Sequence, residues 1–220
     1  NVTWAVFGDS HAVELSYSLA KELQKDNQGV LHLSYSACPP TFKDDTNACG
    51  VWTTKAIDRI LEKKSVKNIV LSYRLAAYLF GRHEDIYPDL PNKTLASDRD
   101  DIWHSYLNLI NFFSNKKYNV FVVLQAPELE NSVRKTIRKK LSINNDLISV
   151  TNKWWSNRNK YVFDRLDDFP KNVHIINPAD YFCNKDNCFS TKKNMSLYFD
   201  DDHMSIHGAS IISKKILSLQ

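Results

Sequence analysis

A serine near the start of this chain and a histidine near its end are the residues best suited to chemistry. Ser10 follows the apolar run Ala5–Gly8 and stands at the start of a predicted helix. Asp200 and His203 lie three residues apart, just before a predicted C-terminal helix. A serine hydroxyl attacks well only when a base takes its proton, and a histidine oriented by a carboxylate is such a base. The pattern predicts acyl transfer through a Ser–His–Asp triad.

Neighbouring residues offer alternatives to this assignment. Asp202 adjoins His203 in the sequence, and we expect its side chain to project elsewhere, which favours Asp200 as the partner. His11 is expected to be structural, whereas His207 is a rival base. A run of three aspartates is also compatible with a solvated acidic loop or with a weak oxygen-rich site for calcium or magnesium.

The elements that must position these residues alternate between strand and helix, which predicts an α/β fold with a parallel sheet. Several of the strands are almost continuously apolar, as expected for strands covered on both faces. We therefore predict a three-layer, flavodoxin-like sandwich in a single domain spanning residues 1–220. The expected strands are Thr3–Gly8, Val30–Tyr35, Asn68–Tyr73, Asn119–Gln125 and Asn172–Asn177, and the expected helices are Ala12–Lys25, Val51–Lys63, Asp98–Phe113, Asn131–Lys140, Leu147–Leu166 and Ser205–Leu219.

The loops after the first three strands are expected to meet at one edge of the sheet. Ligands of open α/β sheets bind beyond the carboxyl ends of the strands. The segments Gly8–His11 and Ser36–Pro40 and the residue Arg74 follow these strands. The long insertion Phe80–Ser97 is expected to hang over the same edge and to bind an acceptor, with Arg82, His83 and Tyr87 as the candidate contacts.

Composition and charge narrow the class of protein. The 220 residues are 43% hydrophobic and carry a net charge of +4, from 29 Lys and Arg against 25 Asp and Glu, which indicates a globular protein with dispersed charge. The basic run Arg134–Lys140 has helical spacing and is interpreted as a solvated helix face, so nucleic acid is not expected as a partner. We find neither a leader nor an apolar stretch of about 20 residues. The segment is expected to be a mature or excised domain that does not itself span the membrane.

The four cysteines fall into two local pairs. Cys38 and Cys49 bracket a polar loop, and Cys183 and Cys188 bracket a short hairpin-like segment. Neither pair has the two-residue spacing of zinc knuckles, and no histidine completes a ligand set, so two disulfides are favoured over zinc. Disulfides imply an oxidising compartment, whereas four free thiols in a cytosolic protein are the alternative.

The end motifs resemble the first and last blocks of the SGNH hydrolase superfamily. Further features resemble the SGNH domains fused behind membrane acyltransferase-3 domains in bacterial surface-polysaccharide O-acetyltransferases. The resemblance runs from about residue 3 to the C-terminus and rests on Gly8-Asp9-Ser10-His11-Ala12, Ser36-Ala37-Cys38-Pro39-Pro40, Cys49 before a helix, the Cys183–Cys188 bracket and Tyr198-Phe199-Asp200-Asp201-Asp202-His203-Met204-Ser205.

The resemblance implies residue roles position by position. Ser10 matches the nucleophile, His203 the base and Asp200 its partner. Ala37 stands where the superfamily has an oxyanion-hole glycine. The third-block asparagine is absent, because the chain has Ser72-Tyr73-Arg74-Leu75 there. Either Arg74 supplies the missing donor, or the oxyanion hole has only two donors.

By this resemblance, the segment is an extracytoplasmic, periplasmic domain of an inner-membrane protein. It would take an acetyl group delivered by its fused acyltransferase-3 domain and pass it to a hydroxyl of lipopolysaccharide O-antigen or another surface glycan. No cofactor and no metal are expected. A carbohydrate or lipid acetylesterase with the same triad is the second hypothesis. A non-catalytic glycan-binding module is the third.

Overall fold

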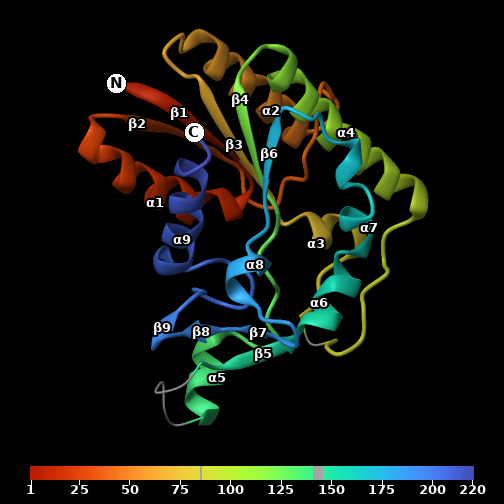
Figure 1. Ribbon diagram of the computed structural model, residues 1–220. Coiled ribbons are helices and arrows are strands. Elements are labelled where there is room, and N and C mark those ends of the chain that lie inside the picture. The colour runs from red at the N-terminus through yellow and green to blue at the C-terminus, as the bar shows by residue number, and fades with distance from the viewer. Residues whose placement is uncertain (85, 141–145) are drawn as a thin grey trace.

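A five-stranded parallel sheet forms the centre of the protein, as seen in the computed structural model (Figure 1). The structure describes residues 1–84, 86–140 and 146–220. The strand order is β2-β1-β3-β4-β6, which is the flavodoxin-like order and confirms the predicted fold class. The strands are β1 (Val2–Gly8), β2 (Gly29–Ser34), β3 (Asn68–Ser72), β4 (Asn119–Val123) and β6 (Val173–Ile176).

Helices cover both faces of this sheet and produce two hydrophobic cores. On one face α1 (Val13–Leu23) and α9 (Ile206–Leu217) pack beside each other (Figure 1). On the other lie α2 (Ala48–Glu62) and α4 (Ala96–Asn115). Alternate residues of β1 enter opposite cores, Trp4 and Val6 the first and Ala5 and Phe7 the second, as expected for a strand buried on both faces.

One predicted element is wrong. The expected helix Leu147–Leu166 is instead the strand β5 (Ile148–Thr151) followed by α6 (Asn152–Arg158), α7 (Lys160–Phe163) and a 3₁₀ turn at Leu166–Asp168. β5 pairs in antiparallel fashion with β7 (Asn187–Phe189), and the Thr151 side chain caps α6 by accepting from the Trp154 amide. Tertiary pairing and this cap override the helical pattern that the segment presents by itself.

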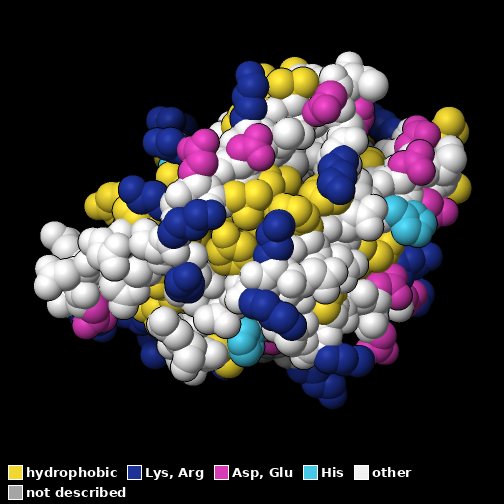
Figure 2. Space-filling view, turned by 90° about the horizontal axis from the view of Figure 1, so that it is seen from above, with side chains coloured by type: hydrophobic (Ala, Val, Ile, Leu, Met, Phe, Trp, Pro, Cys, Tyr) yellow, Lys and Arg dark blue, Asp and Glu magenta, His cyan; other side chains and the backbone are white. Residues whose placement is uncertain are grey.

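The remaining elements are short. They are α3 (Leu75–Phe80), α5 (Val133–Lys140), α8 (Ala179–Phe182), β8 (Thr191–Lys192), β9 (Met195–Ser196) and the 3₁₀ turns Ser10–Ala12 and Gln24–Asp26. Of these, α5, α8, β8 and β9 lie in the lower half of the molecule in Figure 1. None of the helices described is both long and apolar enough to cross a membrane. The face seen from above carries Lys and Arg side chains mostly separated by acidic, hydrophobic and uncharged ones (Figure 2), which agrees with dispersed charge.

Candidate active site

Ser10 and His203, 193 residues apart in the chain, meet at the carboxyl edge of the sheet. The Ser10 Oγ lies 2.8 Å from the His203 Nε2. On the far side of the ring, the His203 Nδ1 lies 2.9 Å from the Asp200 Oδ2, in hydrogen-bond geometry. The three side chains therefore form a continuous hydrogen-bonded chain. In the neutral form of His203, Nδ1 donates to the carboxylate and Nε2 is left to accept the serine proton.

Ser10 is positioned by the end of β1 and by a buried carboxylate. Gly8 is the last residue of β1, and a Cβ there would overlap the carbonyl oxygen of Ser72 on β3, so the close approach requires glycine. Asp9 is 1% exposed. Its Oδ1 accepts from the His11 amide, and its Oδ2 accepts from the Arg74 amide and the Tyr78 hydroxyl. Asp9 thus joins the turn after β1 to the turn after β3.

The loop that carries His203 is held by backbone hydrogen bonds from another part of the chain. The Leu129 amide donates to the Asp201 carbonyl at 2.7 Å, and the Val133 amide, at the start of α5, donates to the Asp200 carbonyl at 3.0 Å. The Asp200 Oδ1 also accepts from the His203 amide at 2.8 Å. Ser205 then caps α9, as predicted, by accepting from the Gly208 amide. The loop is therefore fixed at both ends.

The expectation that Asp202 projects away from His203 is wrong. Its Oδ1 lies 2.9 Å from the His203 Nδ1, and its Oδ2 lies 2.7 Å from the Arg74 Nε and 3.4 Å from the His11 Nε2. Asp202 is 3% exposed, and the turn of the loop points its side chain inward. His11 packs against the His203 ring, with ring centroids 4.4 Å apart. Two carboxylates, not one, therefore face the imidazole.

This pair of carboxylates controls the charge of His203. Burial alone would lower the pKa of His203, but the hydrogen bond to Asp200 and the contact with Asp202 raise it to about 10. For Asp202 itself, burial raises the pKa, and the contacts with His11 and His203 outweigh this and hold the pKa well below its usual range. His203 is thus a cation at neutral pH in the resting protein, and it gains its basic form as the pH rises.

We expect Asp202→Asn to move the alkaline rise of activity to lower pH. His203 accepts a proton only when neutral, so the rate for p-nitrophenyl acetate should rise with pH up to about 10. Removing one carboxylate removes stabilisation of the imidazolium, so the rising limb of kcat/KM should shift down by about one pH unit or more. Asp201→Asn is the matched control, because its carboxylate does not contact His203 among the described residues. If the pH dependence of kcat/KM does not shift in Asp202→Asn, then Asp202 does not raise the pKa of His203.

Arg74 lines the same cavity as Ser10 and His203 and lies in a cluster of carboxylates. Its Nε approaches Asp202 and Glu128 at 2.7 and 3.2 Å, and its Nη2 donates to Glu84 at 3.1 Å. Among the described residues, no hydrogen bond engages its Nη1. These acids raise the pKa of Arg74 even though burial opposes them. The guanidinium is therefore a permanent cation whose charge is largely balanced before any ligand binds.

Glu128 and Arg158 belong to the same cluster and were not identified from the sequence. Glu128 is fully buried and accepts from the Arg158 Nε at 2.7 Å and from the Arg74 Nε at 3.2 Å. Burial raises the pKa of Glu128, but these partners and His83 hold it well below its usual range. The sequence could have identified Glu128, because this residue follows β4 at the edge of the sheet where ligands bind. It could not have identified Arg158, because this residue fell within a predicted helix.

An open cavity of about 380 Å³ exposes Ser10 and His203 to ligands. Ser36, Ala37, Arg74 and Tyr78 contribute to its walls, so the segments expected at this edge are brought together. Ala37 has a φ of 60°, in the left-handed region that favours glycine. This conformation explains why the resembling proteins have glycine here, while an alanine can still present its backbone amide.

The three residues predicted to contact the acceptor lie in different surroundings in the structure. Arg82 lines the cavity with Ser10. His83 does not reach the cavity: it is 1% exposed and hydrogen bonds to the Leu129 carbonyl at 2.8 Å and to the Arg74 Nη2 at 3.1 Å. Tyr87 packs edge-on against Trp154, with ring centroids 5.2 Å apart, in a separate small hydrophobic cluster. The positions of these residues in one loop do not indicate which side chain lines the cavity and which are buried elsewhere.

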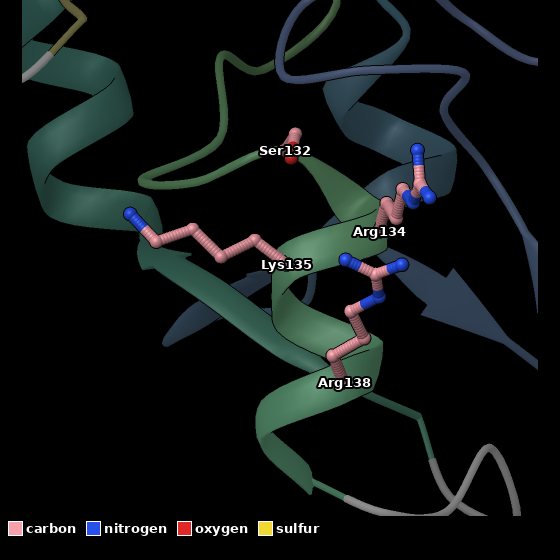
Figure 3. Close-up of a pocket in the computed structure, with 4 residues that line it drawn as sticks. All are labelled: Ser132, Arg134, Lys135 and Arg138. Atoms are coloured by element: carbon pink, nitrogen blue, oxygen red, sulfur yellow. The ribbon is translucent and has the colours of Figure 1, made fainter.

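Another hollow, of about 510 Å³, lies on α5 and is lined by Ser132 and the basic residues of that helix. Arg134 and Arg138 project from one side of the helix and Lys135 from the other (Figure 3). The cations therefore diverge, as predicted for a solvated helix face, and among the described lining residues no histidine or carboxylate accompanies Ser132. The chemistry favours the smaller cavity at Ser10.

The acidic run near His203 has partners within the protein. Asp200, Asp201 and Asp202 place carboxylate oxygens within 4.8 Å of one another, a spacing that a metal ion would accept. However, Asp200 hydrogen bonds to His203, and Asp202 pairs with Arg74. Basic side chains thus already contact two of the three carboxylates.

Both predicted disulfides are present, Cys38–Cys49 and Cys183–Cys188. The first joins the loop that carries Ala37 to the start of α2, and it therefore restrains one wall of the Ser10 cavity. The second closes the turn before β7.

The chain belongs to the family described as the SGNH domain (fused to AT3 domains), whose model matches residues 1–218. The match covers almost the entire chain and confirms the family suggested by the end motifs. Fold and family together define an SGNH-type domain of the hydrolase and acetyltransferase class, which supports an acyl-transferring enzyme. No curated protein sequence shows significant similarity to the chain.

Solved structures share this fold at low sequence identity. The periplasmic domain of a lipopolysaccharide acetyltransferase from Salmonella ser. Paratyphi A aligns with a TM-score of 0.71 and 16% identity, covering 100% of this chain and 84% of that one. A putative SGNH hydrolase from Slackia heliotrinireducens gives a TM-score of 0.56 at 13% identity, covering 99% and 98%. Est24, a carbohydrate acetylesterase from Sinorhizobium meliloti, aligns with a TM-score of 0.51 at 10% identity, and the alignment covers 100% of both chains.

Proposed function

We propose that this domain is a glycan O-acetyltransferase that works through an acetyl-Ser10 intermediate. The observation that carries the proposal is the 2.8 Å contact between the Ser10 Oγ and the His203 Nε2 at an open cavity, with Asp200 on the opposite ring nitrogen. Membership of a family fused to AT3 domains supports a transferase.

The reaction follows from these positions. His203 takes the Ser10 proton as Oγ attacks the acetyl carbonyl, and it returns that proton to the leaving group of the donor. The product of this half-reaction is the acetyl ester of Ser10. An acceptor hydroxyl then loses its proton to His203 and attacks the ester, and His203 restores the proton to Ser10. No cofactor enters either half-reaction.

The developing oxyanion requires donors in the cavity. We propose the Ser10 and Ala37 amides and the Arg74 Nη1, which has no hydrogen-bond partner among the described residues. Because Glu84, Glu128 and Asp202 balance the charge of Arg74, it should act mainly as an oriented N–H donor. One donor of this kind contributes about 10²–10³ in rate in other acyl-transfer enzymes.

The proposed setting is the periplasmic side of an inner-membrane protein. The acetyl donor would be delivered by a fused AT3 domain, and the acceptor would be a sugar hydroxyl of O-antigen or another surface glycan. Two disulfides and the family description support this setting. Arg82 is proposed as an acceptor contact because it lines the cavity with Ser10.

An acetylesterase is the second candidate function, since the cavity is open and water can reach the acyl enzyme as easily as a sugar does. A glycan-binding module without catalysis is a weaker candidate, because binding alone does not require a serine hydrogen bonded to a histidine–carboxylate pair.

Product analysis tests the proposal. The protein is incubated with p-nitrophenyl acetate, with and without purified O-antigen polysaccharide, and both protein and glycan are analysed by mass spectrometry. We expect one acetyl group on the Ser10 peptide and, when glycan is present, an acetyl ester on the sugar. Acetate as the sole product, at a rate unaffected by glycan, supports the esterase instead. If neither release of p-nitrophenol nor acetylated Ser10 is found under any condition, both functions are contradicted.

A further inference from the structure

A second cavity, of about 300 Å³, adjoins the segment 77–82 that also borders the Ser10 cavity. Phe80, Leu90 and Asn92 reach it from the chain after β3, Arg99 from α4, and Asn157 and Arg158 from α6. Ala77, Tyr78 and Arg82 line the Ser10 cavity. A volume of about 300 Å³ is at the small end of the range for ligand sites and suits a single sugar unit. We call this hollow the Arg99 cavity.

The charge of the Arg99 cavity favours an anion. Two arginines line it, and none of its described lining residues is an aspartate or glutamate. The Arg99 Nη1 donates to two neutral oxygens, the Asn92 Oδ1 at 2.9 Å and the Thr94 carbonyl at 2.7 Å, and Arg99 forms no ion pair within the described part of the chain. A guanidinium held in this way retains its full positive charge, and its planar fork matches a carboxylate.

Arg158 adds a donor that the protein leaves unused. It is 2% exposed, and its Nε and Nη2 bind Glu128 and the Gly81 carbonyl. Its Nη1 is buried and has no hydrogen-bond partner among the described residues. A buried donor without an acceptor costs free energy, so an oxygen atom entering beside Arg158 would be stabilising.

The rest of the lining suits a sugar ring. Phe80 and Leu90 provide apolar surface, and Leu90 is 45% exposed although it is a large hydrophobic residue. Asn92 and Asn157 supply side-chain amides that both donate and accept. A pyranose presents C–H groups on its faces and hydroxyls at its rim, so one sugar unit can use both kinds of surface.

We infer that the Arg99 cavity binds a carboxylate-bearing sugar unit, next to the sugar that is acetylated at Ser10. Arg99 pairs with the sugar carboxylate, and the two asparagines bind its hydroxyls. The inference rests on the proposed glycan transferase function for its acceptor, while the binding site itself rests on the cavity. It assigns an acidic glycan as the acceptor class.

An NMR titration of the ¹⁵N-labelled protein tests this site with galacturonate, galactose and acetate as probes. We expect saturable shifts of the signals of Asn92, Arg99 and Asn157 with galacturonate, and affinities at least about tenfold weaker for galactose and acetate. Arg99→Met should raise the Kd for galacturonate by about tenfold, the scale of one charge-assisted hydrogen bond. Arg59→Met, which changes an exposed arginine on α2, is the matched control and should leave the Kd unchanged.

The outcomes separate this inference from the proposed function. Ser10→Ala should bind galacturonate as tightly as the unaltered protein. No saturable shift, equal affinity for acetate, or an unchanged Kd in Arg99→Met overturns the site, even if acetylated Ser10 is found. Conversely, galacturonate binding without acetyl transfer leaves the site intact and removes the transferase.

Discussion

Replacing Ser10 with alanine should abolish acetyl transfer while the fold persists. Removal of the nucleophile from a Ser–His–Asp unit costs about 10⁶ in kcat in a well-studied case, and removal of the base costs about as much. We therefore expect Ser10→Ala and His203→Ala each to lose activity to background. Asp200→Ala should lose less than the roughly 10⁴ known for a triad with one carboxylate, because Asp202 still lies 2.9 Å from the His203 Nδ1. The measurement is release of p-nitrophenol from p-nitrophenyl acetate, with circular dichroism to verify the fold.

His207→Ala is the control for this series. His207 lies in the first turn of α9 and does not contact Ser10 in the described structure, so its loss should leave the rate within about twofold. Normal activity in His203→Ala together with inactive His207→Ala contradicts the assignment of the base. Full activity in Ser10→Ala contradicts the covalent mechanism altogether.

Replacing Glu128 with alanine should reduce the free energy of unfolding by about 3–5 kcal/mol. Glu128 is fully buried between Arg74, Arg158 and His83. Removing it leaves the buried Arg158 without a carboxylate partner among the described residues, whereas Arg74 keeps Asp202 and Glu84. Breaking a buried ion pair from one side has this magnitude, because the remaining charge stays desolvated. Urea unfolding followed by tryptophan fluorescence measures the change.

Glu62→Ala is the matched control, since Glu62 is exposed and, within the described residues, pairs only with the exposed Arg59 on α2. Its effect on the free energy of unfolding should stay below about 1 kcal/mol. If Glu128→Ala does not fold, Glu128→Gln provides the second measurement and should be destabilised to a smaller extent. A loss below about 1 kcal/mol in Glu128→Ala contradicts the cluster as a source of stability.

The pH dependence of stability provides an independent check on Glu128. Its pKa in the folded protein is lower than in the unfolded chain, so its contribution to stability is fully present above pH 4.5 and is lost as the pH falls further. Glu128→Gln should therefore lose less stability than the unaltered protein when both are taken from pH 7 to pH 3.

The sheet was predictable because its strands are apolar on both faces. All five predicted strands overlap the observed ones, since a run such as Ala5–Gly8 has few other ways to bury its side chains. The segment 147–166 was not predictable, because its first residues gain their partners only from β7, some 40 residues later. Its helical pattern was genuine, but tertiary pairing decided the outcome.

The candidate site was predictable where spacing alone determines position. Asp200 lies three residues before His203, and this separation lets its carboxylate reach Nδ1. Asp202 shows the limit of such reasoning, since neighbouring residues were expected to diverge and the tight loop turns both carboxylates inward. Contacts that need three distant segments at once, such as Arg74 with Glu128 and Arg158, leave no local pattern in the chain.

The two amides that hold the histidine loop, those of Leu129 and Val133, have a consequence for how this domain can vary. Main-chain groups are present whatever the side chain, so Glu130, the exposed position between these two anchors, tolerates many substitutions. An inserted or deleted residue there would instead shift one of the two amides by roughly one residue spacing, about 3.5 Å, away from the carbonyl that it holds in the histidine loop. The segment between Leu129 and Val133 can therefore change in sequence but not in length.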